Sequence, residues 1–156
     1  MENKELAQEL LNKIIGLRPT RVKLGYGSFI TIDLGRDIAE EIKTRQGKKV
    51  IYFGEWHFWV YMCAWRIDQH NMPLVGSNDD REIIQNYLRK LDNKTITNIR
   101  VLNTSFDVVF SFEDGIELYL FSSDTKENEH WKFYTSNNKV FTAGPGHLCS
   151  YKNDSE

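Results

Sequence analysis

Apolar residues recur at helical spacing near the beginning of the chain. Five of them fall on one side of a helix with 3.6 residues per turn: Leu6, Leu10, Leu11, Ile14 and Ile15. Gly16 suits the residue that ends a helix, and Pro19 cannot continue one. The pattern predicts a helix over residues 2–15 whose apolar stripe packs on the rest of the fold, with a partner-binding helix as the alternative.

A second helical pattern begins after Ser77. Asp79, Asp80 and Glu82 bring negative charge to the first turn, where the helix dipole favours it. The apolar residues that follow share one face: Ile83, Ile84, Tyr87, Leu88 and Leu91. We therefore predict a helix over residues 79–91.

Alternation of apolar and polar residues, which is typical of strands, runs through residues 28–34. One set, Ile30, Ile32 and Leu34, is wholly apolar and is expected to face the core. Asp33 then belongs to the opposite face of the strand. A preceding strand is expected to begin at residue 21, and the chain is expected to bend at Gly25 and Gly27, before residue 28.

The second half of the chain predicts a meander of short strands. Asp114-Gly115 favours a tight hairpin turn, because these residues tolerate positive φ angles. Further alternating segments are expected near residues 96–102, 106–112, 116–120, 131–134 and 140–141. The tail becomes polar after residue 146, and we expect it to fray beyond about residue 147.

The run from Gly54 to Ile67, Gly-Glu-Trp-His-Phe-Trp-Val-Tyr-Met-Cys-Ala-Trp-Arg-Ile, holds three of the four tryptophans. Both alternating sets are largely apolar, which predicts a central strand that is covered on both sides. A helix is the alternative, but the leading Gly54 and the aromatic enrichment favour a strand. The run is longer than the usual strand of about 5–6 residues, so a bulge, a bend or a division between two layers is expected.

Residues 35–49 allow two interpretations. Ile38, Ala39 and Ile42 have the spacing of a short helix, whereas the charges around them and Gly47-Lys48-Lys49 suit a hairpin tip equally well. In either case this segment is predicted to be an exposed excursion.

The chain has 156 residues, which fits one domain. Its 13% of aromatic residues favours sheet, because flat rings pack well on a pleated surface. We therefore predict a single α+β domain. It would contain a mainly antiparallel twisted sheet of roughly 6–8 strands with two helices packed on it.

Charge and composition narrow the function classes. A net charge of −2 offers no basic excess for phosphates, so nucleic acid is not the expected partner. The longest apolar run is far shorter than the ~20 residues that span a bilayer, and the N-terminal residues lack signal-peptide features. Cys63 and Cys149 have no metal-ligand spacing. We expect a cytoplasmic protein with no metal, no cofactor and no membrane contact.

The aromatic run resembles that of an uncharacterised family of small bacterial proteins, which share a Gly-x-Trp-His-aromatic segment ending in Ala-Trp-Arg-Ile. The hairpin at Phe112–Gly115, the strand at Trp131 and the turn at Gly144-Pro145-Gly146 are similar as well. These proteins resemble immunity-type proteins, which accompany bacterial toxins. The resemblance implies a protein partner and supplies no catalytic residue.

Candidate chemistry lies on polar residues around the aromatic run. Asp33, Glu55 and His57 are able to meet on neighbouring strands as an acid–base group. Glu55 and His57 are two residues apart and therefore share a face of one strand. The simpler interpretation is a polar strand end with a hydrogen-bonded histidine.

Arg66 and Asp68 form a second candidate pair at the other end of the run. Stacking of Arg66 on an aromatic ring with a carboxylate partner would be structural, and binding of an anionic ligand is the alternative. We therefore expect a non-enzymatic protein-interaction module, and the resemblance implies an immunity-like protein that binds a partner toxin. The alternative is a small-molecule binder or enzyme that uses the face carrying Glu55, His57 and Arg66.

Overall fold

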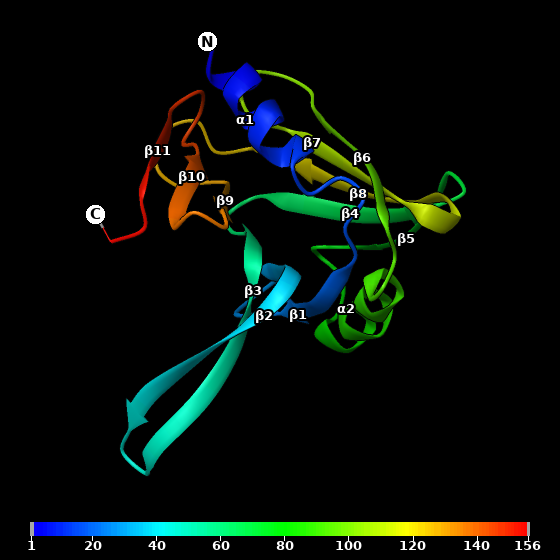
Figure 1. The fold of residues 1–156 in the computed structure, drawn as a ribbon. Helices are drawn as coiled ribbons and strands as arrows, with labels where there is room; N and C mark the ends of the chain where they lie inside the picture. The colour runs from blue at the N-terminus through cyan, green and yellow to red at the C-terminus, as the bar shows by residue number, and fades with distance from the viewer. Residues whose placement is uncertain (1, 156) are drawn as a thin grey trace.

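The strands form two antiparallel sheets whose inner faces meet in one core. The computed structural model describes residues 2–155 (Figure 1). The six-stranded sheet contains, in spatial order, β1 (Pro19–Leu24), β2 (Ile30–Thr44), β3 (Gly47–Val60), β9 (Trp131–Tyr134), β10 (Lys139–Ala143) and β11 (Cys149–Asn153). The five-stranded sheet contains β5 (Met72–Gly76), β4 (Ala64–Gln69), β8 (Ile116–Phe121), β7 (Val108–Phe112) and β6 (Ile96–Val101).

The predicted α+β class with antiparallel strands and two helices is confirmed. The strand arrangement differs from the expected single sheet of roughly 6–8 strands, because the eleven strands of residues 2–155 are divided between two sheets. The physical reason for two sheets is the number of apolar residues that face inward from these strands. One sheet face cannot bury the inward residues of all these strands, whereas two facing sheets can.

The two helices pack against strands at the margins of the sheets. α1 (Asn3–Asn12) lies along β6, and the Gln8 side chain donates to the carbonyl of Ile99 and accepts from the N–H of Val101, both at 2.8 Å. This contact covers the outer edge of β6. α2 (Arg81–Leu88), extended by the 3₁₀ turn η1 (Arg89–Leu91), packs on β1 and β5. Both α-helices lie within their predicted ranges.

The aromatic run is divided between the two sheets. β3 ends at Val60 and β4 begins at Ala64, so the chain crosses from one sheet to the other through residues 61–63. The expected division between two layers is thereby confirmed. The expected cover on both sides is wrong, because His57 and Trp59 are only half-buried on the outward face of β3.

Phe58 lies where the two sheets meet. Its side chain is fully buried, and its ring centroid lies 4.9 Å from that of Phe110 in the opposite sheet. The ring of Trp131 in the neighbouring strand is 5.0 Å away. The predicted inward set, Ile30, Ile32 and Leu34, is buried in the same core.

Residues 36–54 of β2 and β3, which we call the arm, form a two-stranded ribbon that extends away from both sheets (Figure 1). Its tip is closed by the Thr44 hydroxyl, which donates to the carbonyl of Gly47 at 2.8 Å. The exposed excursion and the hairpin interpretation of this segment are confirmed, and the short helix is wrong. The register aligns Ile38 with Phe53 and Ile42 with Lys49.

The polar tail is ordered as a strand. β11 pairs with β10 along its whole length, from Lys139 opposite Asn153 to Ala143 opposite Cys149. Cys149 and Tyr151 pack against the core, and this packing holds the strand in place. The predicted fraying beyond residue 147 is therefore wrong. No helix of residues 2–155 is both long enough and apolar enough to cross a membrane.

Candidate functional site

The outward face of the six-stranded sheet carries a polar network at the base of the arm. The strand register places Arg21 of β1, Asp33 of β2 and His57 of β3 side by side. One Asp33 oxygen contacts His57 Nδ1 at 2.6 Å, and the other accepts from Arg21 Nε at 3.1 Å. Burial alone raises the pKa of the Asp33 carboxyl, but the hydrogen bonds and charge from His57 and the bond from Arg21 outweigh it and hold this pKa below its usual value.

Arg21 also fastens the base of the arm. Its two terminal nitrogens contact the two carboxylate oxygens of Asp37, at 2.8 and 3.1 Å. A planar guanidinium fixes the direction of a carboxylate that it binds with two parallel hydrogen bonds. Because Asp33 lies in the sheet and Asp37 lies in the arm, Arg21 ties the direction of the arm to the sheet.

A β-bulge marks the point where the arm leaves the sheet. Gly35 and Arg36 lie opposite Glu55, between the pairs Leu34–Trp56 and Asp37–Gly54. Gly35 has a φ angle of +79°, and the Arg36 N–H donates to Glu55 Oε1 at 3.1 Å. A Cβ atom on Gly35 would lie 2.5 Å from Cγ of Glu55, so the bulge requires glycine at this position.

A groove of about 510 Å³ lies between the arm and the turn that joins β9 to β10. Its floor includes His57 and Trp59, and Phe53 and Tyr134 contribute further aromatic rings. Charged groups at the groove are mostly acidic: Glu40, Glu55 and Asp154 face a single lysine, Lys139. This composition suits an apolar or cationic group better than an anion.

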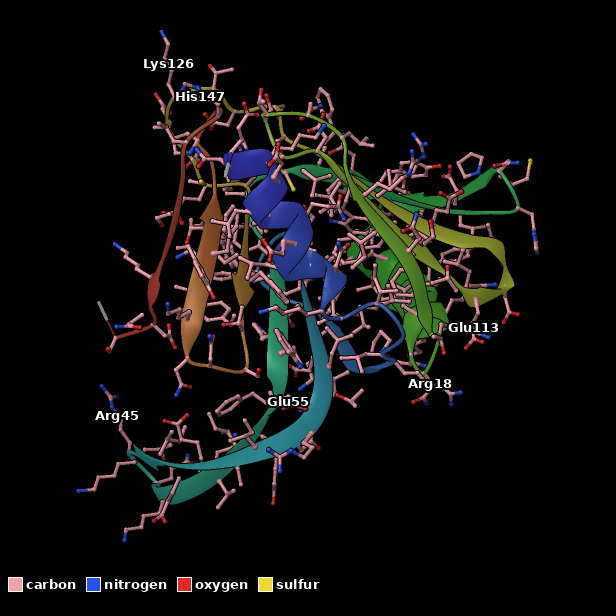
Figure 2. All side chains as sticks on the ribbon, turned by 45° about the horizontal axis from the view of Figure 1, so that its top comes forward. Arg18, Arg45, Glu55, Glu113, Lys126 and His147 are labelled. Atoms are coloured by element: carbon pink, nitrogen blue, oxygen red, sulfur yellow. The ribbon has the colours of Figure 1, made fainter. Side chains whose placement is uncertain are left out.

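The tip of the arm has the opposite charge. Residues 43–49 include four basic residues and no acidic one: Lys43, Arg45, Lys48 and Lys49. Figure 2 shows Arg45 at this far end and Glu55 where the arm joins the sheet. The arm therefore runs from an acidic base to a basic tip.

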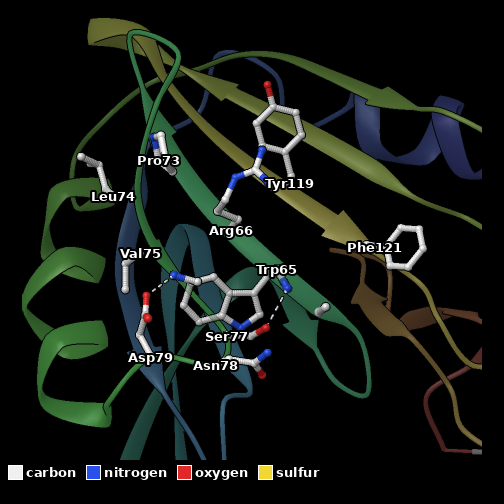
Figure 3. Close-up of a pocket in the computed structure, with 12 residues that line it drawn as sticks. Trp65, Arg66, Pro73, Leu74, Val75, Ser77, Asn78, Asp79, Tyr119 and Phe121 are labelled. Carbon is white, nitrogen blue, oxygen red and sulfur yellow. Dashed lines mark hydrogen bonds between the residues drawn. The ribbon is translucent and has the colours of Figure 1, made fainter.

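Arg66 lies beside Tyr119 on the outward face of the five-stranded sheet (Figure 3), and Asp68 follows two residues later on the same strand. Arg66 donates to both oxygens of Asp68, at 2.7 and 3.1 Å, and its guanidinium lies 5.1 Å from the ring centre of Tyr119. The hollow beside them measures about 540 Å³. The charge of Arg66 is already balanced by Asp68, which fits the structural interpretation of this pair better than the anion-binding one.

The five candidate residues do not form one site. Asp33 and His57 are in contact, and Glu55 joins His57 in the lining of the groove. Arg66 and Asp68 belong to the other sheet and line no part of this groove. The proposed face carrying Glu55, His57 and Arg66 together is therefore wrong, because the chain changes sheets between His57 and Arg66.

Sequence reasoning missed Arg21 and Asp37, which complete the network around Asp33. Both are ordinary charged residues of exposed strands in the sequence, and only the strand register brings them together. Alternation placed Asp33 on the outward face, opposite the inward set of β2, but it does not identify neighbours across strands.

The described residues include neither a metal-binding cluster nor an activated Cys63 thiol. Among residues 2–155, no group of three or more His, Cys, Asp or Glu side chains is placed to hold a metal ion. Burial raises the pKa of the Cys63 thiol to about 12, so this residue is protonated and a poor nucleophile at neutral pH. The hydrogen bonds of Asp33 to His57 and Arg21 match the hydrogen-bonded histidine expected at a polar strand end.

Comparison of the chain with protein families, curated proteins and solved structures finds no match. The resemblance to an immunity-type family therefore remains a prediction from the motifs of the aromatic run. The features that bear on function are the arm, the groove and the polar network at the base of the arm.

Proposed function

We propose that this protein is a non-enzymatic interaction module that binds another polypeptide through its arm. The observation that carries the proposal is the exposure of large apolar side chains on the arm. Ile38, Val50 and Tyr52 are 40%, 51% and 61% exposed, because they belong to a ribbon with no sheet packed on it. Val50 and Tyr52 share one face of the ribbon, and Ile38 lies on the other. Exposed apolar side chains on a projecting element favour a protein interface.

The backbone of the arm supports the same proposal. An isolated two-stranded ribbon is at best marginally stable in water, and its unpaired edges attract further strands. Here the Arg21–Asp37 contact and the bulge at Gly35 hold such a ribbon away from the body. A permanently presented ribbon is useful for adding a strand or wedging against a partner.

Half-buried aromatic residues also gather on the outward face of the six-stranded sheet, at the end of the β2–β3 hairpin opposite the arm. The Phe29 and Tyr61 ring centres lie 4.7 Å apart, and the Trp59 and Tyr61 centres lie 4.9 Å apart. Tyrosine and tryptophan are enriched at the centres of protein interfaces. An immunity-type protein that binds a toxin would be one form of this function.

The alternative, a binder of a small anionic ligand, has less support. Arg66 is paired with Asp68 on the other sheet, and the groove beside His57 is bordered by three carboxylates. An anion entering that groove would meet charge of its own sign.

Site-specific photo-crosslinking in the source cells tests the proposal. A photoreactive phenylalanine analogue replaces Tyr52 in one variant and Tyr26 in a matched control. Tyr26 is 88% exposed but lies outside the arm, in the turn between β1 and β2. We expect a covalent adduct with another polypeptide chain from position 52 and much less from position 26. A folded variant that forms no adduct at position 52 would contradict the proposal.

A further inference from the structure

The outer edge of β3 is unpaired along the arm. β9 pairs with β3 only from His57 to Val60, and no other strand of residues 2–155 pairs with the edge formed by residues 47–56. The edge of β6, by contrast, is covered by Gln8. Residues 47–56 also include no proline that would block pairing. This edge is therefore ready to accept a strand.

The sequence of this edge is complementary to itself in the antiparallel direction. Lys48 and Lys49 precede four apolar residues, Val50 to Phe53, and Glu55 follows them. When two such strands pair antiparallel with Tyr52 opposite Tyr52, Lys49 of each lies opposite Glu55 of the other. In the same register, Ile51 lies opposite Phe53, so apolar side chains meet at the centre and opposite charges at both ends.

We infer that the partner of this edge is a second copy of the chain, which pairs through β3 about a two-fold axis at Tyr52. The inference rests on the proposed function and names the occupant of the arm. Such a pairing is closed, because each copy uses the same surface on the other.

The charge distribution of the arm supports the same geometry. Antiparallel arms bring the tip of each copy to the base of the other. The basic tip of residues 43–49 then approaches the groove that Glu40, Glu55 and Asp154 make acidic. The groove is lined by both strands of the arm and by the turn after β9, the strand that follows β3 in the sheet, so it lies beside the path of the incoming strand. The outer edge of β2 is less suited to self-pairing, because Glu40 and Glu41 lie near its middle.

A charge-exchange experiment tests the register. In Lys49→Glu, two glutamates would oppose each other at both ends of the pair, and in Glu55→Lys two lysines would. We expect sedimentation velocity to show a wild-type dimer, and each variant alone to dissociate with a Kd raised by at least about tenfold. An equimolar mixture of the two variants should recover the dimer as a heterodimer.

The mixture controls for damage within each chain. Glu55→Lys also removes the hydrogen bond from the Arg36 N–H, but mixing cannot repair a contact inside one chain. Recovery on mixing therefore supports the intermolecular contact between residues 49 and 55. A wild-type protein that is monomeric at all concentrations, or variants that dimerise like the wild type, would overturn the inference.

A cysteine pair provides an independent measurement. Opposed residues of antiparallel strands have Cα atoms about 4.5–5.5 Å apart, which suits a disulfide. Tyr52→Cys should therefore form an intermolecular disulfide on mild oxidation, beyond the background given by the wild type. Val50→Cys is the matched control, because it shares the strand, the face and a similar exposure but lies off the axis. Faster crosslinking of Val50→Cys would exclude this register.

The two proposals fail separately. A monomeric wild type whose position 52 still crosslinks to a different protein would overturn the second-copy inference and leave the interaction module intact. A monomeric wild type with no adduct at position 52 would contradict both.

Discussion

The base and the arm of the β2–β3 hairpin are formed by the same two strands but have different surroundings. At the base, Ile30 and Ile32 lie beside Phe58 and Val60, and all four are fully or almost fully buried. In the arm, Val50 and Tyr52 are exposed. The base has β1 and β9 on its two sides and the second sheet beneath it, whereas the arm has only its own two strands.

This difference shows that backbone pairing of the strands does not depend on burial of their side chains. Both parts of the hairpin have a regular antiparallel register, so backbone pairing does not require a core beneath it. Burying an apolar side chain contributes about 1.5–3 kcal/mol, and the base obtains this stabilisation within the chain. None of residues 36–53, all of which the structure describes, is buried. The arm can therefore gain comparable stabilisation only when another polypeptide covers it.

The largest expected effect on the free energy of unfolding appears when one aromatic residue of the base is compared with one of the arm. Phe58→Ala should lower the free energy of unfolding by about 3–5 kcal/mol, because it leaves a cavity against Phe110 and Trp131. Tyr52→Ala should change it by less than about 0.5 kcal/mol. Urea unfolding at low protein concentration, where the arms are free, measures both. Similar losses in the two variants would show that the arm is packed in solution.

A smaller effect on the free energy of unfolding is expected when the two carboxylates that bind Arg21 are compared. Asp33→Asn should lower the free energy of unfolding by about 1–3 kcal/mol at pH 7, because Asp33 is buried and its bonds to Arg21 and His57 lose their charge. Asp37→Asn, in the exposed part of the same network, should cost less than about 1 kcal/mol.

The pH dependence of this contribution follows from the direction of the pKa shift. The pKa of Asp33 is lower in the folded protein than its ordinary value of 3.8. Its contribution is therefore fully present above the ordinary value and is lost as the pH falls through the lower folded value. Urea unfolding between pH 7 and pH 2 should show a steeper acid loss in the wild type than in Asp33→Asn. Parallel curves for the two proteins would exclude this role of the carboxylate.

Periodicity predicted the parts of the fold that depend on one element at a time. The stripe containing Leu10 and Leu11 identified the first helix, and both residues are buried. The inward set containing Ile30 and Ile32 was also identified correctly, which placed Asp33 on the outward face beside His57. These predictions succeeded because one element with one buried face leaves a regular pattern in the sequence.

Features that depend on several elements left no such pattern. At residues 61–63 the chain changes sheets, and the inward set shifts from Phe58 and Val60 to Cys63 and Trp65. This shift separated Arg66 from His57, which the sequence had placed in one candidate site. The β4–β5 turn at His70-Asn71 carries no glycine that would mark it in the sequence, because both residues adopt positive φ themselves.

Gly35, at the boundary of the base and the arm, provides the last comparison. Gly35→Ala places a Cβ atom against Glu55 and forces a non-glycine residue into a positive φ angle. We expect a loss of about 1–2 kcal/mol in the free energy of unfolding. Gly25→Ala is the matched control, because its Cβ atom would meet Phe29 at an ordinary 3.7 Å. Amide hydrogen exchange should then show faster exchange at residues 36 and 37 in Gly35→Ala, with the base of β2 at residues 30–34 unchanged. If the loss instead spread to residues 30–34, the base and the arm would be one cooperative unit, and the boundary at the bulge would be wrong.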